Sequence, residues 1–157
     1  MGILGFLFAP FRQLFSGVIR ARNKRIIGPQ THSLIQAAQS GHVEAQFLLG
    51  YILSEGEGVD RDLEQAIHWY RQAAVRGHDN ARINLAIAYC EGDGVEKDMA
   101  KAYGWVCLAA FTETEKAPPL RDEIARHLTP EEIAAGQAWA QSQRDVDLQE
   151  AERKEAE

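Results

Sequence analysis

The residues of this sequence whose types could bind a metal are five histidines, two cysteines and a large set of acidic side chains. The histidines form no HExxH motif, and no pair of them stands at metal-ligand spacing beside a carboxylate. The segment Glu91-Gly92-Asp93-Gly94 resembles part of a calcium loop, but it lacks the regular carboxylates and the closing glutamate that calcium needs. The sequence therefore predicts no metal site and no cofactor.

Nucleophilic catalysis also has little support. The sequence contains no P-loop, no GxSxG and no SxxK motif. Cys90 and Cys107 have no CxxC spacing, and two cysteines are too few for a disulfide framework. In the helices predicted below, their offset along the helix axis is on the order of 10 Å, too far for a disulfide. We expect free thiols, a cytoplasmic protein and no enzymatic activity.

The charges are distributed unevenly along the chain, whose formal net charge is -6. No acidic residue precedes Glu44, whereas five basic residues do: Arg12, Arg20, Arg22, Lys24 and Arg25. The remainder carries 12 of the 17 basic residues and all 23 acidic ones. Because so acidic a body would repel phosphate, the composition argues against nucleic acid as a partner.

The elements that would position any site come from an internal repeat of 36 residues. Residues 41–76 align with residues 77–112, and 13 positions are identical between the two copies. The identities include both glycines of a central loop, one tryptophan and four alanines in each copy. This agreement indicates that one structural unit has been duplicated.

Each copy is predicted to form two helices joined by a polar loop. In 43–54 and in 63–75, apolar residues recur at helical spacing. Gly56 and Gly58 can adopt the positive φ that ends the first helix, and Asp62 can cap the second. Trp69 and Trp105 are expected to fill gaps between helices. Because one such pair cannot bury its apolar face alone, the copies should stack into a solenoid.

These motifs carry a family resemblance. The first copy resembles the Sel1-like repeat in the string Ala45-Gln46-x-x-Leu49-Gly50, Gly56-x-Gly58-Val59-x-x-Asp62, Ala66-x-x-Trp69-Tyr70-x-x-Ala73-Ala74-x-x-Gly77-His78. The second copy repeats this string with Val106 where Tyr70 stands, and Ala37-Ala38-x-x-Gly41-His42 looks like the end of an earlier unit. The resemblance covers about 35–112 and implies an all-α, tetratricopeptide-like αα superhelix that acts as an adaptor or scaffold.

Four regions follow from these patterns. Residues 28–112 form the repeats, with a half repeat before the two full ones. Residues 113–145 are expected to cap the array with two helices: one from Leu120 to about Leu128, and one that starts at the capping box of Thr129 and Glu132 and ends near Arg144. Residues 146–157 form a charged tail expected to fray into solvent. Residues 1–27 form a separate hydrophobic and basic segment.

A partner surface is predicted on the first helix of each copy, on the side opposite the core positions Ala45, Leu49 and Leu53. In related αα solenoids this side lines a concave groove. An extended peptide or a helix with basic residues would suit this groove. The residues predicted to contact the partner are Glu44, Leu48, Tyr51, Glu55, Asn80, Asn84, Ile87 and Glu91. Solvated helix surface is the plainer interpretation of the same positions.

The N-terminal segment is amphipathic from Phe11 onward, with one apolar face and one basic face. This pattern is typical of a helix on an anionic membrane surface, at the inner face of a membrane. A cap over the first helix or an oligomer contact, and a mitochondrial presequence or signal anchor, stay open as alternatives. The predicted membrane contacts are Phe11, Arg12, Leu14, Phe15, Val18, Ile19, Arg20 and Lys24.

The sequence thus predicts a protein-interaction adaptor, tethered to a membrane if the N-terminal segment binds one. The alternative from another class is a protein that binds or hydrolyses a small molecule, since some Sel1-like proteins have been linked with β-lactams. A deep pocket with converging ionisable groups would favour that alternative, whereas a shallow groove would favour the adaptor.

Overall fold

The computed structural model describes residues 30–111 and 117–155, and the side chains of residues 32–111 and 117–145. These residues form seven helices and no strand. The helices are α2 (Gln30–Gln39), α3 (Val43–Glu55), α4 (Leu63–Ala74), α5 (Asp79–Glu91), α6 (Met99–Ala110), α7 (Ala117–Ala125) and α8 (Pro130–Glu155). The all-α prediction and the helix pairs of both copies are confirmed.

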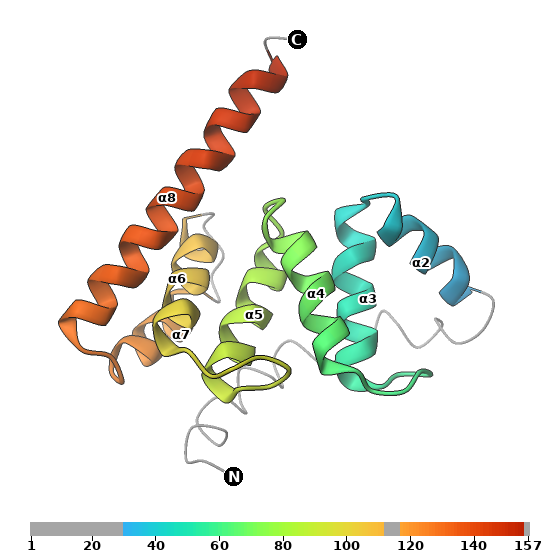
Figure 1. Cartoon of the computed structure of the whole chain (residues 1–157), viewed down its shortest axis with the longest axis horizontal. Coiled ribbons are helices and arrows are strands. Elements are labelled where there is room, and N and C mark those ends of the chain that lie inside the picture. The colour runs from blue at the N-terminus through green and yellow to red at the C-terminus, as the bar shows by residue number, and fades with distance from the viewer. Residues whose placement is uncertain (1–29, 112–116, 156–157) are drawn as a thin grey trace.

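Helices adjacent in sequence pack against one another from α2 to α7, and α8 packs against α6. Figure 1 shows α2 to α6 side by side as a curved stack, with α8 running away from it toward the C-terminus. Alanines at the contacts, such as Ala73, Ala74, Ala81 and Ala109, are fully buried, which lets the helix backbones approach closely. Trp105 is buried in the main core, and Trp69 is partly exposed beside a smaller cluster of α2 and α3 residues.

Local hydrogen bonds explain why each unit turns where it does. Gly56 and Gly58 have φ of 71° and 76°, and Gly92 and Gly94 repeat this with 79° and 72°. The amide of Asp62 then donates to Leu53 O at 2.9 Å, which folds the loop back onto the end of α3. The Asp62 carboxylate caps α4 by accepting from the amide of Gln65 at 2.9 Å. These bonds confirm the predicted roles of the two glycines and of the aspartate.

The C-terminal region differs from the prediction in its helix bounds. The predicted helix 120–128 is α7, which begins at Ala117. Pro118 and Pro119 fit its first turn, because a backbone N–H there would have no hydrogen-bond partner within the helix. The predicted capping box is confirmed, since the Thr129 amide donates to Glu132 Oε2 and the Glu132 amide donates to Thr129 Oγ1. However, α8 continues to Glu155 instead of ending near Arg144, so the expectation that the charged tail frays is wrong. Its residues include strong helix formers such as Leu, Gln, Glu, Ala, Arg and Lys.

Candidate interaction groove

A groove opens between α3, α4 and α5. Its inner wall is apolar and comes mainly from α4 and α5, through Leu63, Ala66, Ile67, Ile87 and Ala88. Two helices of the first unit and the first helix of the second unit therefore build it together. The packing of α3 on α4 and of α4 on α5 sets its width.

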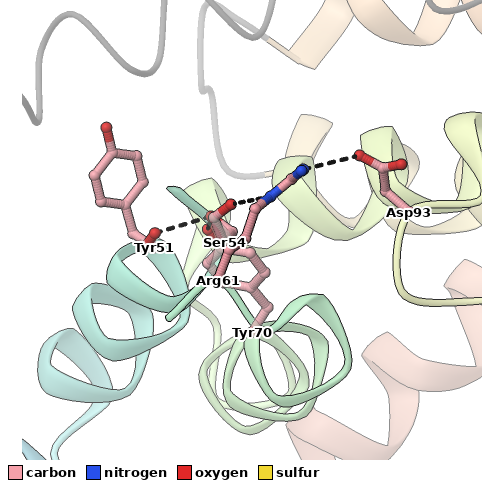
Figure 2. A network of polar contacts seen from close by, with 5 residues as sticks. All are labelled: Tyr51, Ser54, Arg61, Tyr70 and Asp93. Carbon is pink, nitrogen blue, oxygen red and sulfur yellow. Dashed lines mark hydrogen bonds and ion pairs between the residues drawn. The ribbon is translucent and has the colours of Figure 1, made fainter. Parts of the chain in front are cut away.

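A hydroxyl pair lies in the groove where α3 meets α4. Ser54 Oγ donates to Tyr51 O at 2.9 Å and lies 3.1 Å from Tyr70 Oη (Figure 2). The ring of Tyr70 fits because residue 50 is glycine: a Cβ there would stand 2.8 Å from the ring. The Asn84 side chain also hydrogen-bonds Tyr70. Since the Ser54 hydroxyl hydrogen is already donated, we infer that Tyr70 donates to Ser54 and accepts from Asn84.

Burial raises the pKa of Tyr70 far above its ordinary value, because the surrounding protein cannot solvate a phenolate. Tyr70 is therefore neutral at every physiological pH. The groove thus contains a fixed polar group within an apolar wall, as small sites that orient a ligand commonly do.

The rim of the groove is acidic. Glu55, Glu91 and Asp93 line it. Arg61 crosses between the two units: its Nε donates to Ser54 O at 2.9 Å, and its Nη2 lies 3.8 Å from Asp93 Oδ2 (Figure 2). Among the described residues that line the groove, three are acidic and none is basic, and the Arg61 guanidinium lies beside one of the three carboxylates, so the rim favours cationic groups.

The structure brings most of the predicted partner-binding residues into this groove. Tyr51, Glu55, Asn84, Ile87 and Glu91 line it, whereas Glu44, Leu48 and Asn80 do not.

The three excluded residues have other surroundings. Glu44 bonds His78 Nε2 at 3.1 Å, Leu48 packs on the main core, and Asn80 is half-buried at the start of α5.

One part of the prediction is wrong. Tyr51 and Ile87 were expected to point away from the core, but they are 4% and 6% exposed and belong to the main core cluster. On the concave side of a curved stack, neighbouring helices converge, so side chains at this position pack on one another. Truncating Tyr51 would therefore remove buried surface, and it cannot serve as a purely surface substitution.

Sequence reasoning missed the contribution of α4 and the hydroxyl pair. A comparison of the copies contains the signal, since Gly50, Ser54 and Tyr70 in the first copy become Ala86, Cys90 and Val106 in the second. These three positions meet in the first copy and all change in the second, which is the pattern expected of side chains that share one site.

The cysteines lie outside this chemistry. Cys90 and Cys107 are buried free thiols. Burial raises the pKa of Cys90 to about 12 and also raises that of Cys107. Neither thiol supplies much thiolate at neutral pH, which is the form that acts as a nucleophile.

No group of three or more His, Cys, Asp or Glu residues within the described parts of the chain is arranged to hold a metal ion. Among the helices from α2 to α8, none has the length and apolarity needed to cross a membrane. The predicted membrane contacts between Phe11 and Lys24 lie outside the described residues.

Comparison with known proteins decides the family. The Sel1 repeat model matches residues 43–78 and 80–110. The crystal structure of a Sel1 repeat protein from Oxalobacter formigenes is 37% identical, with a TM-score of 0.56, and the match covers 57% of this chain and 68% of that one. This chain belongs to the Sel1 repeat family.

A second solved structure extends the match. It is a protective antigen present in uropathogenic Escherichia coli strains, displaying an SLR fold, with 31% identity and a TM-score of 0.69. The match covers 71% of this chain but only 24% of the antigen, so this Sel1 repeat chain spans about a quarter of that protein. Among curated proteins, none matches the chain. Sel1 repeat proteins generally act as scaffolds for protein–protein interaction and are typically not enzymes.

Proposed function

We propose that this Sel1 repeat protein is an adaptor that binds a segment of a partner protein in the groove between α3, α4 and α5. The observation that carries the proposal is the convergence of two repeat units on one groove with an apolar wall, a polar centre and an acidic rim. A flat solvated surface would have none of these features.

The groove chemistry defines the kind of segment that would fit. Apolar side chains of a bound helix or extended peptide would contact Ile67 and Ile87. Basic side chains would meet Glu55 and Glu91 at the rim. The Tyr70–Asn84 pair would help to fix the position of the bound segment, because a ligand that left it unpaired would lose binding free energy.

A site-specific photocrosslinker tests this assignment. A benzoylphenylalanine at Asn84, inside the groove, should form an adduct with a partner protein in the native host. The same probe at Lys101, on α6 and outside the groove, is the matched control and should form none with that partner. Adducts of one partner at both positions, or at Lys101 alone, would contradict the proposal. Adding Glu55→Lys should reduce the adduct, whereas Glu96→Lys, an equal charge change outside the groove, should not.

The alternative of a hydrolytic or small-molecule-binding protein has no observation in its favour. Among the described residues that line the groove, only Ser54, Tyr51 and Tyr70 carry hydroxyls, and none of the lining residues is histidine, lysine or cysteine. Ser54 is instead held by Tyr51 O and Tyr70. A serine nucleophile needs an adjacent base to activate it.

Membrane association through residues 11–24 stays a prediction. Full-length protein should co-sediment with anionic vesicles, and Arg20→Glu with Lys24→Glu should reduce this binding, as should added salt.

A further inference from the structure

The groove and the sequence that precedes α2 have opposite charge. The rim residues Glu55, Glu91 and Asp93 are acidic. Residues 1–29, which lie outside the described residues, contain five basic side chains and no acidic one. The same chain therefore contains an acidic groove and a basic segment, and the basic segment has the charge that this groove favours.

The segment also matches the apolar wall. In residues 11–26, the apolar side chains Phe11, Leu14, Phe15, Val18 and Ile19 recur at helical spacing, and four of the five basic residues follow between positions 20 and 25. Recognition of an amphipathic segment by a groove uses apolar anchors of this kind with charges at the edge. The groove supplies the complement: aliphatic residues of α4 and α5 inside, and carboxylates outside.

The attachment point places the segment within reach. The described chain begins with α2 at Gln30, and Leu34 and Ile35 share a small cluster with Leu49 and Leu53 of α3. Leu53 is two residues from Glu55 on the rim. With residues 11–26 bound, residues 27–29 form the tether, and the four steps from residue 26 to Gln30 reach about 14 Å. The segment would therefore enter the groove at the end of α3 nearest to α2, where Leu53 and Glu55 lie.

We propose that residues 11–26 bind in the groove of their own chain and compete with the partner protein. A short tether gives an effective concentration on the order of millimolar, so even a weak contact would be populated. A partner would then bind with an apparent affinity reduced by the fraction of molecules whose groove is open. This inference uses the groove of the proposed function but adds its occupant, and it stands or falls separately.

Paramagnetic relaxation in the full chain tests the proposal. Asn23→Cys supplies an attachment site for a nitroxide, because Cys90 and Cys107 are buried thiols with raised pKa values. In dilute, isotope-labelled protein, the amide signals of Ser54 and Asn84 should lose most of their intensity relative to the reduced label. The signal of Arg126, at the far end of the array, should keep its intensity.

Charge reversal makes the test specific. Glu55→Arg with Glu91→Arg should restore the signals of Ser54 and Asn84. Arg20→Glu with Lys24→Glu, added to that variant, should bring the intensity loss back, which also shows that the reversed groove is still folded. Glu64→Arg with Glu96→Arg, the same charge change outside the groove, should leave the loss unchanged.

Four results would overturn the proposal. Ser54 and Asn84 would keep full intensity in the labelled wild-type background, or the groove reversal would leave the loss unaltered. Equal loss in a mixture in which the nitroxide and the isotope are on different molecules would assign the segment to a second copy. If the amide signals of the protein lose intensity only when anionic vesicles are added, the segment would be assigned to a membrane. Crosslinking at Asn84 decides the adaptor function independently, since it detects a foreign protein.

Discussion

The two repeat units share one framework and differ in what they pack against. Gln46 and Arg82 occupy equivalent, buried positions, and each donates to a carbonyl of the preceding helix, Ala38 O at 3.1 Å and Ala74 O at 3.0 Å. Elsewhere the units diverge: Tyr70 of the first faces the groove, whereas Val106 of the second is fully buried. The shared positions maintain the stack, and the variable ones adapt each unit to its neighbours.

A second divergence lies on α4 and α6. His68 is exposed on α4, but Gly104 stands at the equivalent position on α6, where α8 packs closely. Trp105 meets Trp139 of α8 edge to face, with ring centroids 5.0 Å apart, whereas Trp69 meets the ring of its own neighbour His68 edge to face, with ring centroids 5.3 Å apart. The second unit thus uses this face for the C-terminal cap, whereas in the first unit His68 is exposed and Trp69 packs beside the cluster of α2 and α3 residues.

The largest expected effect concerns the shared buried position. Arg82→Ala should lower the free energy of unfolding by about 3 kcal/mol, because it removes the side-chain hydrogen bonds to the carbonyls of Ala74 and Leu108 and a buried charge beside Asp79. Gln46→Ala should cost only about 1 kcal/mol, since Gln46 is neutral and has one such bond. Urea denaturation of both variants checks the difference. Equal losses would show that the two positions are interchangeable.

The next effect separates the outer faces. Gly104→Leu should lower the free energy of unfolding by about 2 kcal/mol, because a Cβ there would stand 2.5 Å from the Trp139 ring. His68→Leu, the same new residue at the equivalent exposed position, should change it by less than about 0.5 kcal/mol. Thermal melts of the pair give the comparison, and a stable Gly104→Leu variant would contradict the close packing of α8.

A third test exchanges the groove pair for its counterpart. Gly50→Ala with Tyr70→Val converts the first unit to the Ala86 and Val106 of the second. Gly50→Ala alone should lower the free energy of unfolding through a clash with the Tyr70 ring, and Tyr70→Val alone should lower it through a cavity. The double variant should be more stable than the sum of the two single losses predicts, with a coupling free energy of about 1–2 kcal/mol. Additive losses would mean that the two positions do not compensate each other.

Cys90 of the second unit stands at the position of Ser54 in the first, and only the cysteine should make the free energy of unfolding depend on pH. The thiol ionises near 9.0 in the unfolded chain but has a pKa of about 12 in the fold. The contribution of the Cys90 thiol to the free energy of unfolding is fully present below pH 9. It is lost as the pH rises toward 12, because over this range only the unfolded chain releases the thiol proton. At pH 10 the loss should be about 1.4 kcal/mol. Cys90→Ser should remove that part of the slope between pH 8 and 10, and an unchanged slope would refute the assignment.

The features that sequence alone predicted are those determined locally. Positive φ at Gly56 and Gly58, the Asp62 cap and the Thr129 capping box each depend on a few adjacent residues. The burial of Tyr51 and the packing of α8 on α6 depend instead on distant contacts, which one unit does not encode. Gly104 in place of His68 was the available sign that another helix would pack on α6.

The central claim is that a protein partner binds in the groove between α3 and α5, and an affinity measurement tests it most directly. The protein that crosslinks at Asn84 should bind Asn84→Ala full-length protein about tenfold more weakly, which corresponds to about 1.4 kcal/mol. Binding to Lys101→Ala, altered outside the groove, should be unchanged, and both variants should melt within a few degrees of the wild type. A weaker complex with Lys101→Ala and an unchanged one with Asn84→Ala would place the partner outside the groove and contradict the account.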